Sequence, residues 1–210
     1  MLEKRPIAAF LDDLASSSPA PGGGSVAALA AALGAALTSM VCNLTIGKKK
    51  YADVEGDMKR ILAQSEELRA QCTALIDKDT EAFNKVMEAY GLPKETDPQK
   101  ALRAAAIREA TKEATLVPLE VMKHCIDAFA LAQQVASAGN ANSVSDAGVS
   151  ALMLHAAAAG AALNVKINLN VLDDPEFVGW KSEEVDSLLN TSAMMLEEIQ
   201  AVVADKMRKK

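Results

Sequence analysis

One aspartate stands where the helical pattern calls for a hydrophobic side chain. Around Asp79, residues at three- and four-residue spacing form an apolar stripe: Leu68, Cys72, Leu75, Phe83, Val86 and Tyr90. Asp79 falls on this stripe, whereas Asp77 points to a nearly opposite helix face. A carboxylate on a buried face must be paired, hydrogen-bonded or protonated, and its pKa can then suit proton transfer. We interpret Asp79 as a general acid or base; the alternative is an ion pair with a cation of another helix.

A second isolated carboxylate is Asp146, which is the only formally charged residue between positions 128 and 165. It follows the amide-rich run GNANS at 139–143 and shares a helical face with Asn164 and Asn168. Fixed amides supply both hydrogen-bond donors and acceptors. We therefore predict a polar pocket in which Asp146 is the second general acid or base and Asn142 orients water or substrate. The predicted binding residues here are Asn140, Ser143, Asn164 and Asn168.

The structural alternative for this second group is simpler. A carboxylate in the first turn of a helix complements the helix dipole, and asparagines before it are common turn residues. That alternative does not account for Asn164 and Asn168, which lie on the same face further along the chain.

Three consecutive glycines lead into an uncharged, small-residue segment at Pro21-Gly22-Gly23-Gly24-Ser25. Glycines allow a ligand to approach the main chain, and a helix start offers unpaired N–H groups to an anion. We predict that Gly22, Gly23, Gly24 and Ser25 form a substrate-binding loop. The alternative is that Ser25 only caps the helix and the glycines only make a tight entry.

Lysines gather at the other end of that segment, in the run TIGKKKY at 45–51. The run is not a phosphate-binding P-loop, because Cys42 and Lys49 occupy positions where that motif needs Gly and Ser or Thr. Lysines at a helix end are usually a solvated patch. We predict instead that Gly47, Lys48 and Lys49 receive an extended anionic ligand, such as a tail of carboxylates.

Helices must position all of these residues. The apolar spacing predicts six of them, over residues 5–15, 25–44, 53–90, 97–135, 143–167 and 182–207, with Pro118 kinking or dividing the fourth. Apart from a short β-like stretch at 164–172, strand alternation is absent from the sequence. We predict an all-α fold, a bundle of long antiparallel helices in a single domain over 1–210. Apolar surface left over on the second, fifth and sixth helices predicts a homodimer.

Composition limits the partners. The net charge is −6 and aromatic residues are only 3%, without a basic stripe, so we expect no nucleic-acid partner. Cys42, Cys72 and Cys125 fit neither a disulfide framework nor zinc spacing, so we expect no metal and a cytoplasmic location. The charged N-terminus does not resemble a signal peptide. Two uncharged stretches, 14–47 and 147–165, are long enough to span a bilayer, but their Ala- and Gly-rich composition favours buried helices, and we expect no membrane span.

Several runs together resemble one family along almost the whole chain. They are PGGGS at 21–25, LTIGKKKY at 44–51, DKDTEAF at 77–83, LPK at 92–94, VPL at 117–119, GNANSVSDAGV at 139–149 and NVKINL at 164–169. This order is similar to the cyclodeaminase/cyclohydrolase family, which comprises the C-terminal half of formiminotransferase-cyclodeaminase and stand-alone methenyltetrahydrofolate cyclohydrolases. Because the resemblance begins within the first ten residues, we expect no formiminotransferase half here.

The resemblance implies an all-helical homodimer that binds a tetrahydrofolate derivative as substrate, with no metal or prosthetic group. The expected activity is the interconversion of 5,10-methenyltetrahydrofolate and 10-formyltetrahydrofolate by general acid/base catalysis. Cyclodeamination of 5-formiminotetrahydrofolate, with release of ammonia, is the alternative, because both activities share these runs. A non-catalytic helical dimerisation module and a small-anion-binding protein are the alternatives from other classes.

Overall fold

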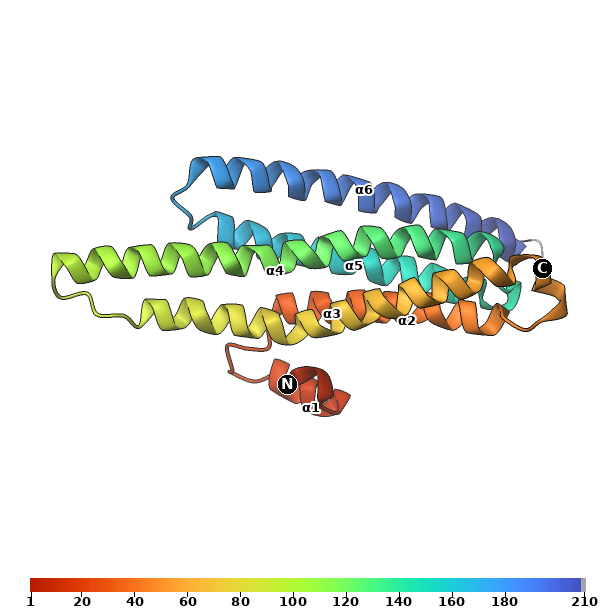
Figure 1. Ribbon diagram of the computed structural model, residues 1–210, viewed down its shortest axis with the longest axis horizontal. Helices are drawn as coiled ribbons and strands as arrows, with labels where there is room; N and C mark the ends of the chain where they lie inside the picture. Colours follow the sequence, from red (N-terminus) through yellow and green to blue (C-terminus); the bar gives the residue numbers. More distant parts are fainter. Residues whose placement is uncertain (209–210) are drawn as a thin grey trace.

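The chain folds into helices joined by short turns (Figure 1). The computed structural model describes residues 1–208, and that part of the chain contains no strand. The main helices are α1 (Ile7–Leu14), α2 (Gly23–Thr45), α3 (Glu55–Tyr90), α4 (Asp97–Ala138), α5 (Val144–Leu169) and α6 (Pro175–Arg208), and three 3-10 turns are η1 (Leu2–Lys4), η2 (Lys49–Val54) and η3 (Ala141–Ser143). The predicted all-α class is confirmed.

The two uncharged stretches form the centre of the molecule as α2 and α5. Small side chains let the two backbones approach closely, since a Cβ on Gly160 of α5 would lie 3.7 Å from the Cβ of Ala27 of α2. A Cβ on Gly34 would lie 2.7 Å from Cδ2 of Leu154, which explains the glycine there. By length and composition, both helices could cross a membrane. However, 61% of the most apolar stretch of α2 and 50% of that of α5 are buried inside the molecule.

Helix boundaries differ from the sequence prediction at three places. Pro118 does not divide the fourth helix, since α4 is one element from Asp97 to Ala138. The stretch at 164–172, which has a brief β-like pattern, continues α5 as far as Leu169. The last helix begins at Pro175 rather than at residue 182, because Asp174 accepts a hydrogen bond from the N–H of Phe177 at 3.1 Å and begins the turn earlier.

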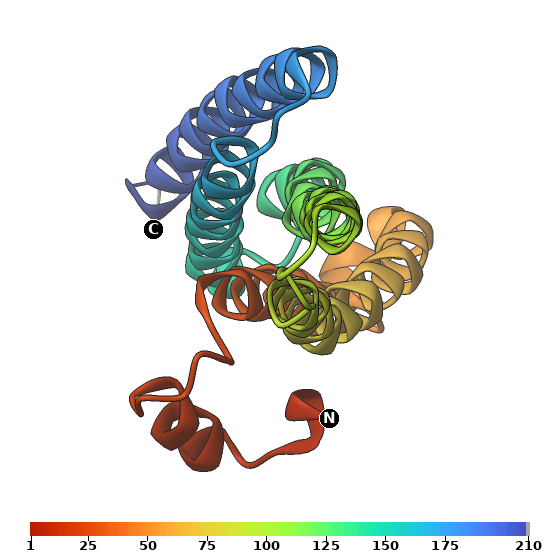
Figure 2. The same ribbon diagram turned by 90° about the vertical axis from the view of Figure 1, so that its left-hand side faces the viewer.

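The N-terminal segment leaves the main body of the molecule before the chain enters α2. Figure 2 shows α1 standing away from the other helices. The first residues of the chain nevertheless contact α3, because the backbone N–H of Leu2, in η1, donates to Oδ1 of Asp77. Asp77 therefore faces η1, and the helical spacing places Asp79 on a nearly opposite face of α3.

Candidate active site

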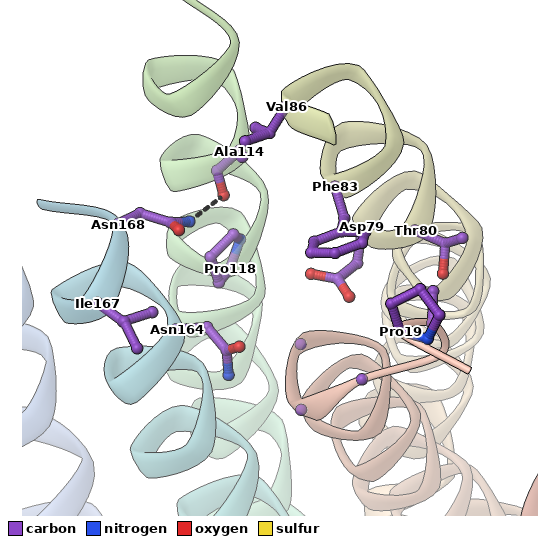
Figure 3. Close-up of a pocket in the computed structure, with 14 residues that line it drawn as sticks. Pro19, Asp79, Thr80, Phe83, Val86, Ala114, Pro118, Asn164, Ile167 and Asn168 are labelled. Atoms are coloured by element: carbon purple, nitrogen blue, oxygen red, sulfur yellow. Dashed lines mark hydrogen bonds between the residues drawn. The ribbon is translucent and has the colours of Figure 1, made fainter. Parts of the chain in front are cut away.

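A cavity of about 380 Å³ opens where the start of α2 meets the last third of α3, the middle of α4 and the end of α5 (Figure 3). Its walls consist of Pro19, Ala20, Gly22, Gly23, Gly24, Asp79, Thr80, Phe83, Val86, Ala114, Pro118, Asn164, Ile167 and Asn168. Six of the residues proposed from the sequence therefore lie in one place, and they come from three different helices.

Asp79 is the acidic group of this cavity, and the start of α2 holds it. Its Oδ2 accepts a hydrogen bond from Oγ of Ser25 at 2.9 Å, and its carboxylate also accepts the backbone N–H of Ser25. Burial raises the pKa of Asp79 above its ordinary value, and the two hydrogen bonds from Ser25 oppose this increase. The result is a half-buried carboxyl group whose pKa is displaced towards the range useful for proton transfer.

Ser25 itself does not line the cavity. Its side chain is fully buried, and Oγ lies 3.1 Å from the carbonyl oxygen of Ile76 and 3.4 Å from Oγ1 of Thr80. The prediction that Ser25 contacts substrate is therefore not supported. Ser25 instead orients the Asp79 carboxylate by hydrogen bonds made outside the cavity.

The glycines make close contacts that side chains would prevent. A Cβ on Gly24 would lie 2.0 Å from Oδ1 of Asp79, and a Cβ on Gly23 would lie 3.2 Å from Nδ2 of Asn164. Gly22 is the N-cap of α2 and has no side chain to close the helix end. The loop therefore brings bare backbone against both polar walls of the cavity.

Two asparagines of α5 form the opposite polar wall. Nδ2 of Asn164 donates to the carbonyl oxygen of Gly160 at 2.9 Å. Nδ2 of Asn168 donates to the carbonyl oxygen of Ala114 at 3.0 Å (Figure 3). Each amide thus uses its NH₂ group on a backbone carbonyl. Their oxygen atoms remain as acceptors for a ligand.

The apolar part of the wall was not proposed as binding surface from the sequence. Phe83, Val86, Pro118 and Ile167 contribute it, and Thr80 adds a hydroxyl group. The sequence runs that carry the family resemblance could have indicated these residues. Thr80 and Phe83 belong to the run DKDTEAF, and Pro118 is the centre of VPL. Phe83 and Val86 also share the helical stripe of Asp79. A largely apolar cavity with a few fixed polar groups is typical of a small-molecule binding site.

The amide-rich turn lies at the other end of α2. The backbone N–H of Asn140 donates to Oγ1 of Thr45 at 2.9 Å, and its Nδ2 donates to the carbonyl oxygen of Leu44 at 2.8 Å. Its Oδ1 accepts the N–H of Asn142 at 3.1 Å, and Oγ of Ser143 donates to the carbonyl oxygen of Asn140. Since the side chains of Asn140 and Ser143 are buried and used within the turn, their predicted role in substrate binding is not supported.

The lysine cluster lies beside this turn. The hydroxyl group of Tyr51 accepts the N–H of Ala141 at 2.9 Å, which joins the lysine run to GNANS. Gly47 has a φ of 77°, a left-handed conformation that favours glycine, and turns the chain after α2. Lys48 and Lys49 are exposed, as are Asn142 and, in part, Asp146.

Two groups of candidate residues therefore lie far apart within one chain. Eighteen helical residues separate Asp146 from Asn164 on α5, which is about 27 Å at the rise of an α-helix. The 23 residues of α2 likewise place the lysine cluster roughly 33 Å from Gly23. Asp79 and Asp146 share no site within a single subunit.

Asp79 is the one titratable side chain among the residues that line the cavity. Among residues 1–208, His, Cys, Asp and Glu side chains form no group of three or more that could hold a metal ion. Burial raises the pKa of Cys42 to about 11 and that of Cys72 to about 12, so these thiols are neutral. Nδ1 of His155 pairs with Oγ of Ser192 at 2.9 Å, between α5 and α6.

Comparison with known proteins matches this arrangement to one family. Residues 6–187 match the family model described as formiminotransferase-cyclodeaminase. The chain belongs to this family. A methenyltetrahydrofolate cyclohydrolase of Methylorubrum extorquens is 52% identical over 200 residues, which cover 95% of this chain and 96% of that protein.

Longer family members match over little more than a third of their length. The formimidoyltransferase-cyclodeaminase of Sus scrofa is 35% identical over 94% of this chain, which spans 37% of that protein. The crystal structure of a formiminotetrahydrofolate cyclodeaminase from Thermotoga maritima covers 98% of both chains, with 33% identity and a TM-score of 0.87. Cyclohydrolases and cyclodeaminases therefore both occur among the relatives of this chain.

Proposed function

We propose that this protein is a methenyltetrahydrofolate cyclohydrolase that interconverts 5,10-methenyltetrahydrofolate and 10-formyltetrahydrofolate. The observation that carries the proposal is the Asp79 cavity, which combines a held carboxylate, two amide oxygens and an apolar wall of suitable size. The relative that matches nearly end to end at 52% identity has this name. Cyclodeamination of 5-formiminotetrahydrofolate is the second candidate, favoured by the 33% identical cyclodeaminase structure.

The chemistry needs a proton acceptor near a cationic carbon. Water attacks the methenyl carbon between N5 and N10 and forms a C–O bond, while the Asp79 carboxylate takes one proton of the water. The bond from this carbon to N5 then breaks while the new hydroxyl group loses its proton and becomes the formyl C=O; N5 takes up one proton, and the formyl group stays on N10. One proton is released overall. The negative charge of Asp79 also stabilises the cationic substrate.

These steps use general acid/base catalysis with the chain's own side chains, and we propose no metal or prosthetic group. The folate derivative is the substrate rather than a resident cofactor. Phe83 and Pro118 would contact the faces of its ring system, and Gly22, Gly23 and Gly24 would contact it through the main chain.

Two assays test the choice of activity. The purified protein is incubated separately with 5,10-methenyltetrahydrofolate and with 5-formiminotetrahydrofolate, following the methenyl chromophore and released ammonia. Loss of the chromophore above the uncatalysed rate, without ammonia release from the second substrate, supports the cyclohydrolase. Ammonia release as the faster reaction identifies a cyclodeaminase, and no turnover of either substrate contradicts both.

We further propose that a homodimer completes the active site. On α2, exposed apolar side chains recur on one face at Val26, Leu33, Met40 and Leu44. On α5, which packs along α2, they recur at Val149, Leu152, Leu163 and Ile167. Apolar faces of this extent on two adjacent helices are typical of subunit interfaces.

The proposed pairing is antiparallel. A two-fold axis perpendicular to α2 places the start of α2 in one subunit opposite its end in the partner. The partner's Asp146, Asn142, Lys48 and Lys49 then approach the cavity that holds Asp79. In this arrangement these four residues can take the roles predicted for them. Within one chain they lie too far from the cavity to do so. The fold as a whole is then a dimer of bundles of long antiparallel helices.

Mixing two inactive variants tests the composite site. Asp79→Asn and Asp146→Asn are each purified, unfolded and refolded together in equal amounts. Half of the dimers are then mixed, and each mixed dimer has one site with both aspartates, so activity returns to about one quarter of the wild-type value. Refolding each variant alone is the control. No recovery on mixing, with both variants dimeric, contradicts the composite site.

The exposed lysines suit the carboxylate tail of a folate, and we propose that Lys48 and Lys49 of the partner bind it. Their attraction acts in the ground state and the transition state alike. Lys49→Gln should then raise KM more for polyglutamylated than for monoglutamylated folate, with kcat within a few-fold. Equal effects on both forms contradict tail binding. A small folate enzyme of this kind is proposed to work in the cytoplasm, without a membrane or nucleic acid as partner.

A further inference from the structure

Pro118 lies buried inside α4, in the wall of the cavity. In an α-helix the N–H of each residue bonds to the carbonyl oxygen four residues earlier. Proline has no N–H, so Pro118 cannot bond to the carbonyl of Ala114. Ala114 is partly buried at the cavity wall, so its carbonyl gains from a donor supplied by another group.

Asn168 of α5 is that donor. Its Nδ2 lies 3.0 Å from the carbonyl oxygen of Ala114 (Figure 3). Because a carbonyl oxygen only accepts, the amide must turn its NH₂ group towards Ala114. In the described part of the chain, no protein donor bonds to Oδ1 of Asn168, and this residue lines the cavity.

We infer that Pro118 is a positioning residue that acts through the carbonyl of Ala114 to fix the Asn168 amide with its oxygen towards the substrate. The inference deepens the proposed function and rests on it for the identity of the ligand. A reduced pteridine ring carries an exocyclic amino group and ring N–H groups along one edge. Oδ1 of Asn168 accepts from that edge.

The neighbouring amide supports an acceptor-rich wall. Asn164 also uses its Nδ2 on a carbonyl, that of Gly160 at 2.9 Å, although no proline freed that carbonyl. With the Asp79 carboxylate, the cavity then presents acceptors on two sides. Such acceptors suit a ligand with several N–H donors along one edge.

Replacing the proline separates this role from simple packing. Pro118→Ala restores the N–H, so residue 118 can bond to the carbonyl of Ala114 and compete there with the Asn168 amide, which is then held less firmly. Alanine also favours the helix interior over proline, so the variant should unfold at a higher temperature. We expect KM for 5,10-methenyltetrahydrofolate to rise about tenfold, the effect of losing one substrate hydrogen bond. Pro98→Ala, at the exposed start of α4, is the matched control and should leave KM unchanged.

A double-mutant cycle tests whether Pro118 acts through Asn168. In an Asn168→Ala background, Pro118→Ala should change KM by less than about twofold, because the amide it orients is gone. The same tenfold change in both backgrounds would mean that Pro118 only shapes the wall, and this overturns the inference.

A readout without substrate distinguishes failure of the inference from failure of the proposed function. The side-chain NH₂ signal of Asn168 is assigned by NMR through its absence in Asn168→Ala. Its exchange with water should be slow in the wild-type protein and faster in Pro118→Ala. Equal exchange rates overturn the positioning role, whereas absence of folate turnover by the wild-type protein overturns only the proposed function.

Discussion

Gly24 and Asp79 are in contact across two helices, because a Cβ on Gly24 would lie 2.0 Å from Oδ1 of Asp79. The carboxylate can occupy the start of α2 only because position 24 has no side chain. The same contact brings Oγ and the backbone N–H of Ser25 within hydrogen-bond reach of Asp79. The glycine run thus makes room for the Asp79 carboxylate as well as for a ligand.

Gly24→Ala should displace the Asp79 carboxylate from the start of α2. We expect turnover to fall by roughly 100-fold, the scale of losing general acid/base assistance. The control is Gly56→Ala, since an added Cβ there meets nothing within 4 Å. Steady-state kinetics of both variants decide the point, and normal turnover in Gly24→Ala would disprove the close contact.

Asp79→Asn should make the protein more stable at neutral pH. Burial raises the pKa of Asp79 in the folded state, so its protonated form contributes stability that is lost as the pH rises through that pKa. Asn carries no charge to bury, and its advantage should shrink as the pH falls towards 4. Thermal unfolding of the wild type, Asp79→Asn and the exposed control Asp53→Asn at both pH values measures this. A gap that widens as the pH falls would contradict the raised pKa.

Ser25→Ala should move the acidic limb of the pH–rate profile. The hydrogen bonds from Ser25 lower the pKa of Asp79, so removing the hydroxyl should raise it further. If ionised Asp79 is the base, kcat/KM should then begin to fall at a higher pH than in the wild type. Ser65→Ala removes another buried hydroxyl, which bonds to the carbonyl of Ala35 at 2.7 Å away from the cavity, and should not move the limb. Identical profiles in all three proteins would remove Ser25 from this role.

Leu33→Glu should prevent assembly and abolish turnover together. Leu33 is 47% exposed at the centre of the apolar face of α2, and a carboxylate there would be buried in the proposed interface. Leu102→Glu is the control, because Leu102 is 67% exposed near the start of α4. Mass photometry with a parallel assay should show a monomer without activity for the first variant only. A fully active Leu33→Glu monomer would rule out a composite site.

The helical pattern predicts which face of a helix a side chain lies on, but it does not predict which side chains lie close together. Asp79 is found on the cavity side of α3, as its apolar spacing indicates. Asp146 and Asn164 share a face of α5 as well, yet 18 residues separate them. Sequence spacing reports the direction of a side chain, and it says nothing about which residues of other helices lie beside it.

The outcomes for Ser25 and Pro118 have the same cause. Ser25 is read from the sequence as a helix cap or a ligand contact, because the arrival of an α3 carboxylate at the start of α2 depends on tertiary packing. Pro118 predicts a kinked or divided helix, but α4 stays one element, and the side chain of Asn168, 50 positions later, satisfies the carbonyl that the proline leaves free. Neither partner is near in sequence.

The most direct test of the account is turnover of 5,10-methenyltetrahydrofolate by the wild type and by Asp79→Asn, measured with the binding of the same folate. We expect the wild type to consume the methenyl chromophore well above the uncatalysed rate. Asp79→Asn should bind the folate and turn it over roughly 100-fold more slowly. Near-wild-type turnover by Asp79→Asn would contradict the account, because the carboxylate on which the site is built would then have no part in the reaction.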